Sequence, residues 1–189
     1  MFAPAHHGAM KHTVGPRKEM GLKTIFNLVG PLTNPAGALN QVIGVYAKKW
    51  VRPIAEVLKE LGSNHVLVVH SKDHLDEISI AEETYVAELI NGSIKEYVIG
   101  PEDFGFSKKP LDSLMVSSAS ESLSIIKQGL LNKNYAASSM IAMNSGAALY
   151  ASGVAGSLKE GVSVAKNCVE SGEGLKKLNE LVIFSKSLS

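Results

Sequence analysis

Neither sign of charge is in excess in this 189-residue sequence, in which 19 lysines and arginines face 18 aspartates and glutamates for a formal net charge of +1. Such a balance gives no basic field to attract nucleic acid or an acidic membrane surface, and it disfavours both classes of partner. Hydrophobic residues make up 45% of the chain and charged residues 20%, as in ordinary globular proteins. A chain of this length can bury a sizeable core in one or two domains.

Cysteine is nearly absent. The one cysteine, Cys168, cannot form an internal disulfide, which fits a reducing compartment, so we expect a cytoplasmic protein. Cys168 lies in the apolar-periodic stretch 162–169, and we expect its thiol to be buried and inert. No apolar run approaches the ~18 residues of a membrane span, and the first residues lack the basic-then-apolar pattern of a signal peptide.

Several motifs of nucleotide and ester chemistry are also missing. The sequence contains no G-x-G-x-x-G fingerprint and no P-loop, which removes the two commonest glycine-rich phosphate cradles. It contains no G-x-S-x-G elbow either, so the usual signature of an α/β-hydrolase nucleophile is lacking.

An acidic pair, Asp76-Glu77, follows the apolar run 66–69, which reads as a buried strand. In open α/β sheets, ligands bind in the crevice beyond the carboxyl ends of the strands. Adjacent carboxylates there suit Mg²⁺, which keeps several waters and takes one or two carboxylates plus substrate phosphates. The alternative is a solvated acidic turn, because charged side chains are mostly exposed for no special reason.

Hydrophobic periodicity predicts an α/β fold. A β-rich run at 41–46, an amphipathic helix at 51–61 ended by Gly62, and a buried strand at 66–70 make a βαβ unit with parallel strands. Asn91-Gly92 between two further apolar runs predicts an antiparallel hairpin over 83–99. We expect a loop at 101–105 and then helices at 120–131, 136–152, 157–171 and 174–184.

The N-terminal part carries a basic cluster of His6, His7, Lys11 and Arg17. Such a cluster suggests an anion site, and arginine offers a planar fork for a carboxylate. The alternative is a solvated basic face. Zinc binding is disfavoured because adjacent histidines cannot both face one metal as an i, i+4 pair would.

A short apolar run at 24–29, expected to form one or two helical turns, leads into a rigid loop at 30–37 with two prolines and two glycines. This loop is either punctuation between elements or a backbone wall, shaped by Pro31, for a flat ligand. Farther along, Asn144-Ser145-Gly146-Ala147-Ala148 lies within a predicted helix. We interpret it as a close-packing surface, because no charged or nucleophilic group accompanies it.

Several strings of residues, spread over nearly the whole chain, combine into the pattern of one enzyme family. They are Phe2-Ala3-Pro4, His7, Ala9-Met10-Lys11, Arg17, Thr24-Ile25-Phe26-Asn27, Gly30-Pro31-Leu32-Thr33-Asn34-Pro35, Leu75-Asp76-Glu77-Ile78-Ser79, Asn144-Ser145-Gly146-Ala147-Ala148 and Ser157-Leu158-Lys159-Glu160-Gly161. On these residues the sequence resembles anthranilate phosphoribosyltransferase, and the block from Thr24 to Pro35 is the most specific part of the resemblance.

The resemblance implies the C-terminal part of the nucleoside phosphorylase/phosphoribosyltransferase α/β domain, with a mixed sheet flanked by helices and a helical excursion near the N-terminus. Residues 5–35 would belong to the small helical domain, and 36–189 would form an incomplete α/β domain. The family transfers phosphoribosyl from phosphoribosyl pyrophosphate to anthranilate in tryptophan biosynthesis, releasing pyrophosphate, and no nucleic acid or membrane takes part.

The resemblance also implies roles for individual residues. Arg17 would hold the anthranilate carboxylate, and His7, Lys11 and Pro31 would line the aromatic pocket. Asp76 and Glu77 would bind the cofactor Mg²⁺ on the pyrophosphate. These roles agree with the fork geometry of arginine and with the use of a metal to neutralise a leaving group.

The sequence departs from the family where residues are missing. It lacks the family's Gly-Thr-Gly-Gly-Asp phosphate loop, its Lys-His-Gly-Asn segment and the N-terminal helical bundle that makes the homodimer contact. Lys23 stands where arginine is usual, and it loses bidentate geometry. We therefore expect the chain to be inactive alone. The alternatives are a catalytically silent relative that binds another ligand, such as nucleic acid, and an interaction module with exposed core surface.

Overall fold

The computed structural model describes residues 26–34 and 36–188. The chain divides into two compact units, Met1–Ala38 and Leu39–Ser189, which are considered separately. Within the described residues, no helix is both long enough and apolar enough to cross a membrane.

The described part of the first unit contains helix α3, Phe26–Leu32. The expectation of a loop from Gly30 onward is wrong at its start, because the helix continues through Gly30 and Pro31. Thr33 explains how the helix ends beyond the proline: its N–H and its hydroxyl both donate to Val29 O at 3.2 Å. The loop therefore begins after Leu32, with the last helical carbonyls satisfied by Thr33.

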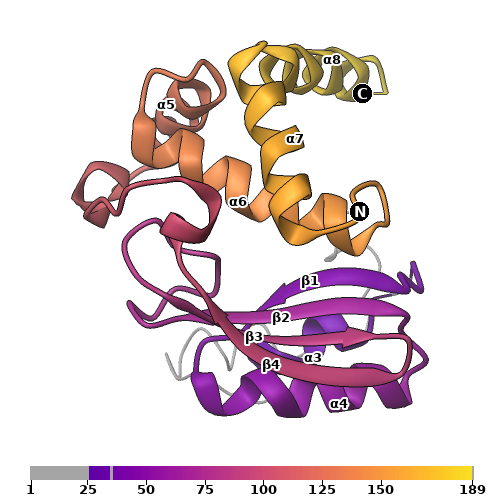
Figure 1. The fold of residues 1–189 in the computed structure, drawn as a ribbon. Coiled ribbons are helices and arrows are strands. Elements are labelled where there is room, and N and C mark those ends of the chain that lie inside the picture. The colour runs from indigo at the N-terminus through magenta and orange to yellow at the C-terminus, as the bar shows by residue number, and fades with distance from the viewer. Residues whose placement is uncertain (1–25, 35, 189) are drawn as a thin grey trace. The chain divides into compact units, whose positions relative to one another are not determined.

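The second unit is built on a four-stranded mixed sheet in the order β1-β2-β3-β4 (Figure 1). Its strands are β1 Asn40–Gly44, β2 His65–Ser71, β3 Thr84–Ile90 and β4 Ser93–Ile99. β1 and β2 are parallel, and the other two pairings are antiparallel. The predicted mixed sheet of an α/β fold is thereby confirmed.

The helix and the hairpin turn that the sequence predicts make connections between the strands. Helix α4, Val51–Glu60, links β1 to β2, and Gly62 ends it in the left-handed region at φ 82°. Asn91 and Gly92 both have positive φ, 50° and 76°, as a type I′ hairpin turn requires. The predicted parallel pair and hairpin are both confirmed.

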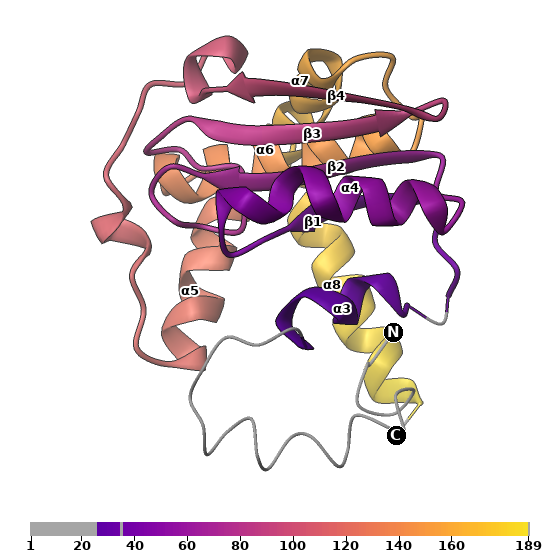
Figure 2. The same cartoon turned by 90° about the horizontal axis from the view of Figure 1, so that it is seen from below.

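Helices cover both faces of the sheet. Figure 1 and Figure 2 show α4 on one face and α6, Tyr135–Ala151, on the other. The remaining helices are α5 Ala119–Leu130, α7 Leu158–Glu170 and α8 Glu173–Ser187, with short 3₁₀ turns at Lys48–Trp50, Pro101–Phe104 and Leu111–Leu114. All four later helices were predicted to within a few residues. The core lies between the sheet and α6, where Leu67, Val69, Val86 and Met143 are almost fully buried.

Helices α6 and α7 cross with their backbones in close contact. A Cβ at Gly161 would lie 2.2 Å from Gly146 O, and a Cβ at Gly146 would lie 2.5 Å from the Val162 backbone. Real Cβ contacts are never so short, so both positions need glycine. The expectation that the small residues of α6 serve close packing is confirmed.

The single cysteine departs from expectation: Cys168 is exposed. Helix α7 buries Val162, Ala165 and Val169, at spacings of three and four residues. Cys168 is one residue before Val169, which turns its side chain about 100° away from that of Val169 and places it outside the stripe. The expectation of a buried thiol is wrong, because membership of an apolar-periodic stretch does not place each of its residues on the apolar face.

A carboxylate lies among aromatic residues on the sheet. Glu88 of β3, 7% exposed, accepts from Tyr97 OH at 3.0 Å and lies 3.0 Å from His65 Nε2. The ring of Tyr150, from α6, packs edge-on against His65 with centroids 4.6 Å apart. Burial and the Glu88 charge raise the pKa of Tyr150 to about 12. The same two causes raise the pKa of Tyr97 well above its ordinary value.

Candidate functional site

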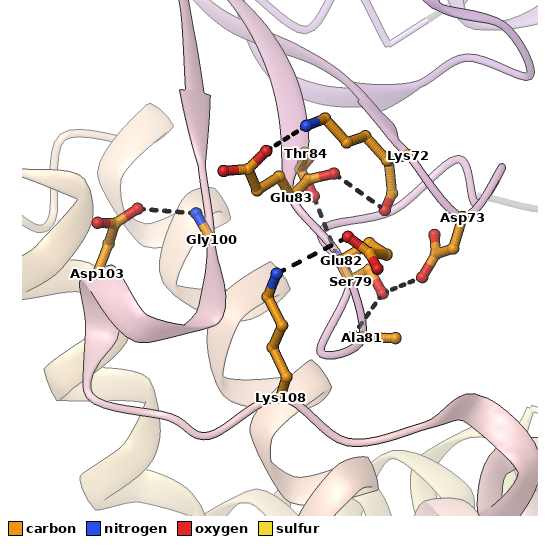
Figure 3. Close-up of polar contacts among 11 residues, drawn as sticks. Lys72, Asp73, Ser79, Ala81, Glu82, Glu83, Thr84, Gly100, Asp103 and Lys108 are labelled. Atoms are coloured by element: carbon orange, nitrogen blue, oxygen red, sulfur yellow. Dashed lines mark hydrogen bonds and ion pairs between the residues drawn. The ribbon is translucent and has the colours of Figure 1, made fainter.

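The acidic pair lies in the loop 72–83, which connects β2 to β3. The loop leaves the sheet beyond the carboxyl end of β2, where the sequence placed it. Lys72 joins the two ends of the loop: its N–H donates to Glu83 O at 2.9 Å, and its Nζ pairs with the Glu83 carboxylate (Figure 3). Lys108 Nζ lies 3.7 Å from the neighbouring Glu82 carboxylate (Figure 3).

The loop is also shaped by hydrogen bonds within it and to the first residue of β3. Ser79 Oγ donates to Asp73 Oδ2 at 2.5 Å and accepts from Ala81 N–H at 2.9 Å, while Ser79 N–H donates to Thr84 Oγ1 at 3.3 Å (Figure 3). Just before the acidic pair, His74 adopts a left-handed φ of 71° and closes a turn by donating to Ser71 O at 3.0 Å. The path into Asp76 is therefore determined by the loop itself.

Two longer-range contacts fix the acidic pair from outside the loop. Asn144 of α6 accepts from Ile78 N–H at 3.0 Å and donates Nδ2–H to Ile78 O at 2.9 Å. On the other side, Gly44 at the end of β1 lies so close to Asp76 that a Cβ there would be 1.7 Å from Asp76 O. The backbone of residues 76–78 is thus held between a strand end and a helix.

The pair borders a hollow of about 460 Å³ at this end of the sheet. The hollow is lined by Val42, Gly44, Val69, Asp76, Glu77, Met140, Ile141, Asn144 and Ser145. Asp76 and Glu77 are exposed, and neither carboxylate has a hydrogen-bond or ion-pair partner among the described residues. Partial burial, and then the charge of Asp76, raises the pKa of the Glu77 carboxyl. A cation beside the two carboxylates would relieve this repulsion.

The donor set fits one kind of metal. In the part of the chain that the structure describes, no group of three or more His, Cys, Asp or Glu residues could enclose an ion. A closed structural zinc site needs four such ligands, and Ca²⁺ takes six to eight oxygens. Mg²⁺ needs only one or two protein carboxylates when water and phosphate oxygens complete its coordination shell. Asp76 and Glu77 therefore suit a Mg²⁺ that arrives with a phosphate ligand.

The other residues singled out in the sequence lie elsewhere. Pro31 lies in α3, in the first unit, and is exposed. His7, Lys11 and Arg17, the remaining candidates for acceptor binding, fall outside the described residues. Their assignment to an aromatic acceptor stays a prediction.

Two residues that shape this site were not recognised from the sequence as part of it. Asn144 was grouped with a packing run, although it is an amide in a stretch of otherwise small side chains. Gly44 was the last-but-two residue of a predicted strand, where a glycine weakens the strand and often marks a close backbone approach. Both signals were present, but neither identifies its partner 32 or 66 residues away.

A mixed α/β sheet with an acidic pair beyond a parallel strand, unpaired among the described residues, places the chain in the class of open α/β domains, whose members typically bind ligands beyond the carboxyl ends of their strands. Within that class, the family model "Glycosyl transferase family, a/b domain" matches residues 1–175. The chain belongs to this glycosyl transferase family.

Individual relatives agree with that assignment. The chain is 57% identical over 188 residues to the anthranilate phosphoribosyltransferase of Marinomonas sp. (strain MWYL1), covering 98% of this chain and 54% of the relative. The crystal structure of the Thermus thermophilus anthranilate phosphoribosyltransferase matches with a TM-score of 0.84 at 38% identity, covering 94% of this chain and 53% of that one.

A third match was solved with ligands. The anthranilate phosphoribosyltransferase of Saccharomyces cerevisiae in complex with PRPP and Mg has a TM-score of 0.78 at 26% identity, covering 92% of this chain and 50% of that one. The chain thus spans about half the length of the relatives it matches.

Proposed function

We propose that this chain supplies the metal-binding half of the active site of an anthranilate phosphoribosyltransferase, an enzyme of tryptophan biosynthesis. The observation that carries the proposal is the Asp76-Glu77 pair, which is unpaired among the described residues, fixed through its backbone and set at the ligand-binding end of a fold that belongs to the glycosyl transferase family. Charged groups that are held in place without a protein partner are suited to an external ligand.

In the proposed reaction, the amine nitrogen of anthranilate bonds to C1 of the phosphoribosyl group. The bond from C1 to the pyrophosphate oxygen breaks, pyrophosphate leaves with the bonding electrons, and the nitrogen loses a proton. Bound Mg²⁺ would neutralise the charge that develops on pyrophosphate. Asp76 and Glu77 would hold the ion, and Gly44 and Asn144 would keep the loop in place. The yeast relative solved with PRPP and Mg supports this cofactor.

The acceptor side of the proposal concerns residues of the first unit. Arg17 would bind the anthranilate carboxylate through its planar fork, and His7, Lys11 and Pro31 would line the acceptor pocket. Residues 5–35 would belong to a small helical domain and 36–189 to the α/β domain. The complete enzyme would be a cytoplasmic homodimer. Positioning of the amine beside C1 would supply much of the rate.

The direct test joins this chain to the N-terminal half of the Marinomonas relative and measures phosphoribosylanthranilate formation by fluorescence. We expect no turnover from the chain alone and Mg²⁺-dependent turnover from the joined protein. Asp76→Asn and Glu77→Gln should each lower turnover at least ~100-fold, in the range of lost charge-stabilising groups. Glu56→Gln, in an exposed ion pair on α4, is the matched control and should leave turnover unchanged.

A joined protein that folds, binds both substrates and gives no product would overturn the proposed activity. Tight, salt-dependent binding of nucleic acid by the chain would instead favour a catalytically silent relative.

A further inference from the structure

The amide of Asn144 is engaged on every side by the protein. Its Oδ1 accepts from Ile78 N–H at 3.0 Å, and its Nδ2 donates to Ile78 O at 2.9 Å and to Met140 O at 3.0 Å. The Met140 contact stays within α6 and fixes the side chain on its own helix. The two Ile78 contacts reach across to the acidic loop, so α6 grips one loop residue through both of its backbone polar groups.

Such a grip requires an amide. Among short side chains, only asparagine presents a carbonyl acceptor and an N–H donor on one rigid plane. An aspartate would have two acceptors and no donor at neutral pH, and a leucine of similar shape would have neither. The close packing of α6 against α7 does not demand this chemistry, because it is made at Gly146, where a Cβ would lie 2.5 Å from the Val162 backbone.

The grip lies next to the candidate metal ligands. Ile78 follows Glu77 directly, and the opposite end of the pair, Asp76, is held by its carbonyl against Gly44 of β1. The carboxylates between these two supports have no partner in the described part of the chain that could orient them. Their direction is therefore set through the backbone, and Asn144 is the side chain that hydrogen-bonds to that backbone from outside the loop.

We propose that Asn144 is a positioning residue, which does not touch the metal but fixes the backbone so that Asp76 and Glu77 face one cation together. This inference rests on the proposed metal role of that pair. Groups that orient metal ligands without touching the ion typically change metal affinity about 10- to 100-fold when they are removed. Without the Asn144 hydrogen bonds, the ion would have to order the loop when it binds, and this ordering would lower the affinity of the site for the metal.

The test uses Mn²⁺ as a paramagnetic substitute for Mg²⁺, with this chain and with the joined protein, and counts bound ion by electron paramagnetic resonance in the presence of pyrophosphate. Asn144→Leu keeps the side-chain shape and removes the hydrogen bonds, and we expect ~10- to 100-fold weaker binding. Asn167→Leu, at an exposed asparagine of α7, is the matched control and should leave affinity unchanged.

A second measurement separates positioning from general stability. Hydrogen exchange of the Ile78 amide should become faster in Asn144→Leu, while the Val68 amide in the middle of β2 keeps its protection. Should Asn144→Leu fail to fold, Asn144→Ala tests the same contacts with less steric demand.

The outcomes distinguish this inference from the function on which it rests. If Asp76→Asn binds Mn²⁺ as tightly as the unchanged chain, the metal role itself fails. If Asp76→Asn weakens binding but Asn144→Leu and Asn144→Ala do not, the metal role stands and the positioning role of Asn144 is overturned. Weaker binding in all three, with Asn167→Leu unchanged, supports both.

Discussion

Asp73 and Asp76 are three residues apart in one loop, yet their carboxylates have different surroundings. The Asp73 carboxylate accepts hydrogen bonds from Ser79 Oγ and from Leu75 N–H, so its partners lie inside the loop. Asp76 has no such partner in the described part of the chain. Their position after the same strand does not separate these two aspartates. The hydrogen bonds do, and they leave the Asp76 and Glu77 carboxylates without a protein partner among the described residues, as the proposed cation role requires.

The contact between Gly44 and Asp76 gives a prediction at this scale. In Gly44→Ala, the new Cβ would lie 1.7 Å from Asp76 O, so the loop or the strand end must shift. We expect the free energy of unfolding to fall by about 1–3 kcal/mol, the usual cost of overpacking, and Mn²⁺ binding to weaken. Urea unfolding followed by circular dichroism measures the first, and paramagnetic resonance the second.

Gly156→Ala is the matched control for that experiment. A Cβ at Gly156 meets only Glu160 Oε2, at 3.2 Å, and this oxygen is the end of a flexible side chain. Its effect should stay within about 0.5 kcal/mol. Equal stability of Gly44→Ala and Gly156→Ala would show that the strand end and the loop are not in contact in solution.

At the scale of elements, the crossing of α6 and α7 depends on two facing glycines. Alanine at position 161 would gain about 1 kcal/mol in helix propensity, but its Cβ would lie 2.2 Å from Gly146 O. We expect the steric cost to prevail, with Gly161→Ala less stable by about 1–3 kcal/mol in urea unfolding. Ser163→Ala, exposed on the same helix, should be neutral or slightly stabilising.

A more stable Gly161→Ala would mean that the two helices cross farther apart than described. The test also bears on the site, because α6 carries both Gly146, at its crossing with α7, and Asn144, which contacts the acidic loop.

Most elements could be predicted from the sequence because their signals are local. The repeat of apolar residues in 51–61 and the Asn91-Gly92 turn depend only on neighbouring residues, and both were confirmed. Errors arose where a distant or capping contact decides the outcome. Thr33 carries α3 past its proline, and the face that α7 turns toward α6 leaves Cys168 exposed.

For the whole molecule, the polar cluster around Glu88 joins three strands and a helix. His65 lies in β2, Glu88 in β3, Tyr97 in β4 and Tyr150 in α6. The ordinary pKa of tyrosine is ~10. Burial and the Glu88 charge raise the folded-state pKa of Tyr150 to about 12 and that of Tyr97 in the same direction. The folded protein therefore holds these phenolic protons more tightly than the unfolded chain does.

This linkage predicts alkaline instability. A folded pKa above the unfolded value contributes stability that is complete below pH ~10 and is lost as pH rises toward the folded pKa. The urea midpoint should accordingly decrease between about pH 10 and pH 12. Absorbance at the tyrosinate band should show Tyr97 and Tyr150 ionising only as the protein unfolds. A midpoint that stays constant over this interval would contradict the arrangement around Glu88.

The place of the acidic pair in the fold was predictable from the sequence, but the contacts that hold it were not. A strand followed by two acids located the pair at the ligand-binding end of the sheet, because strand direction is a local property. Its supports could not be inferred, since Asn144 and Gly44 meet the loop only after the helices and strands have packed. The acceptor residues Arg17, His7 and Lys11 stay predictions made from resemblance.

The close approach at Gly44 has a consequence for how this sequence can vary. Every single-base change of a glycine codon that yields another amino acid introduces a Cβ, and here that atom would collide with the carbonyl of Asp76. Every amino-acid substitution at position 44 therefore carries a steric penalty. The exposed Asp76 side chain, by contrast, could change without one. A lineage that no longer needed the acidic pair would be expected to lose the carboxylates first and to keep the glycine for much longer.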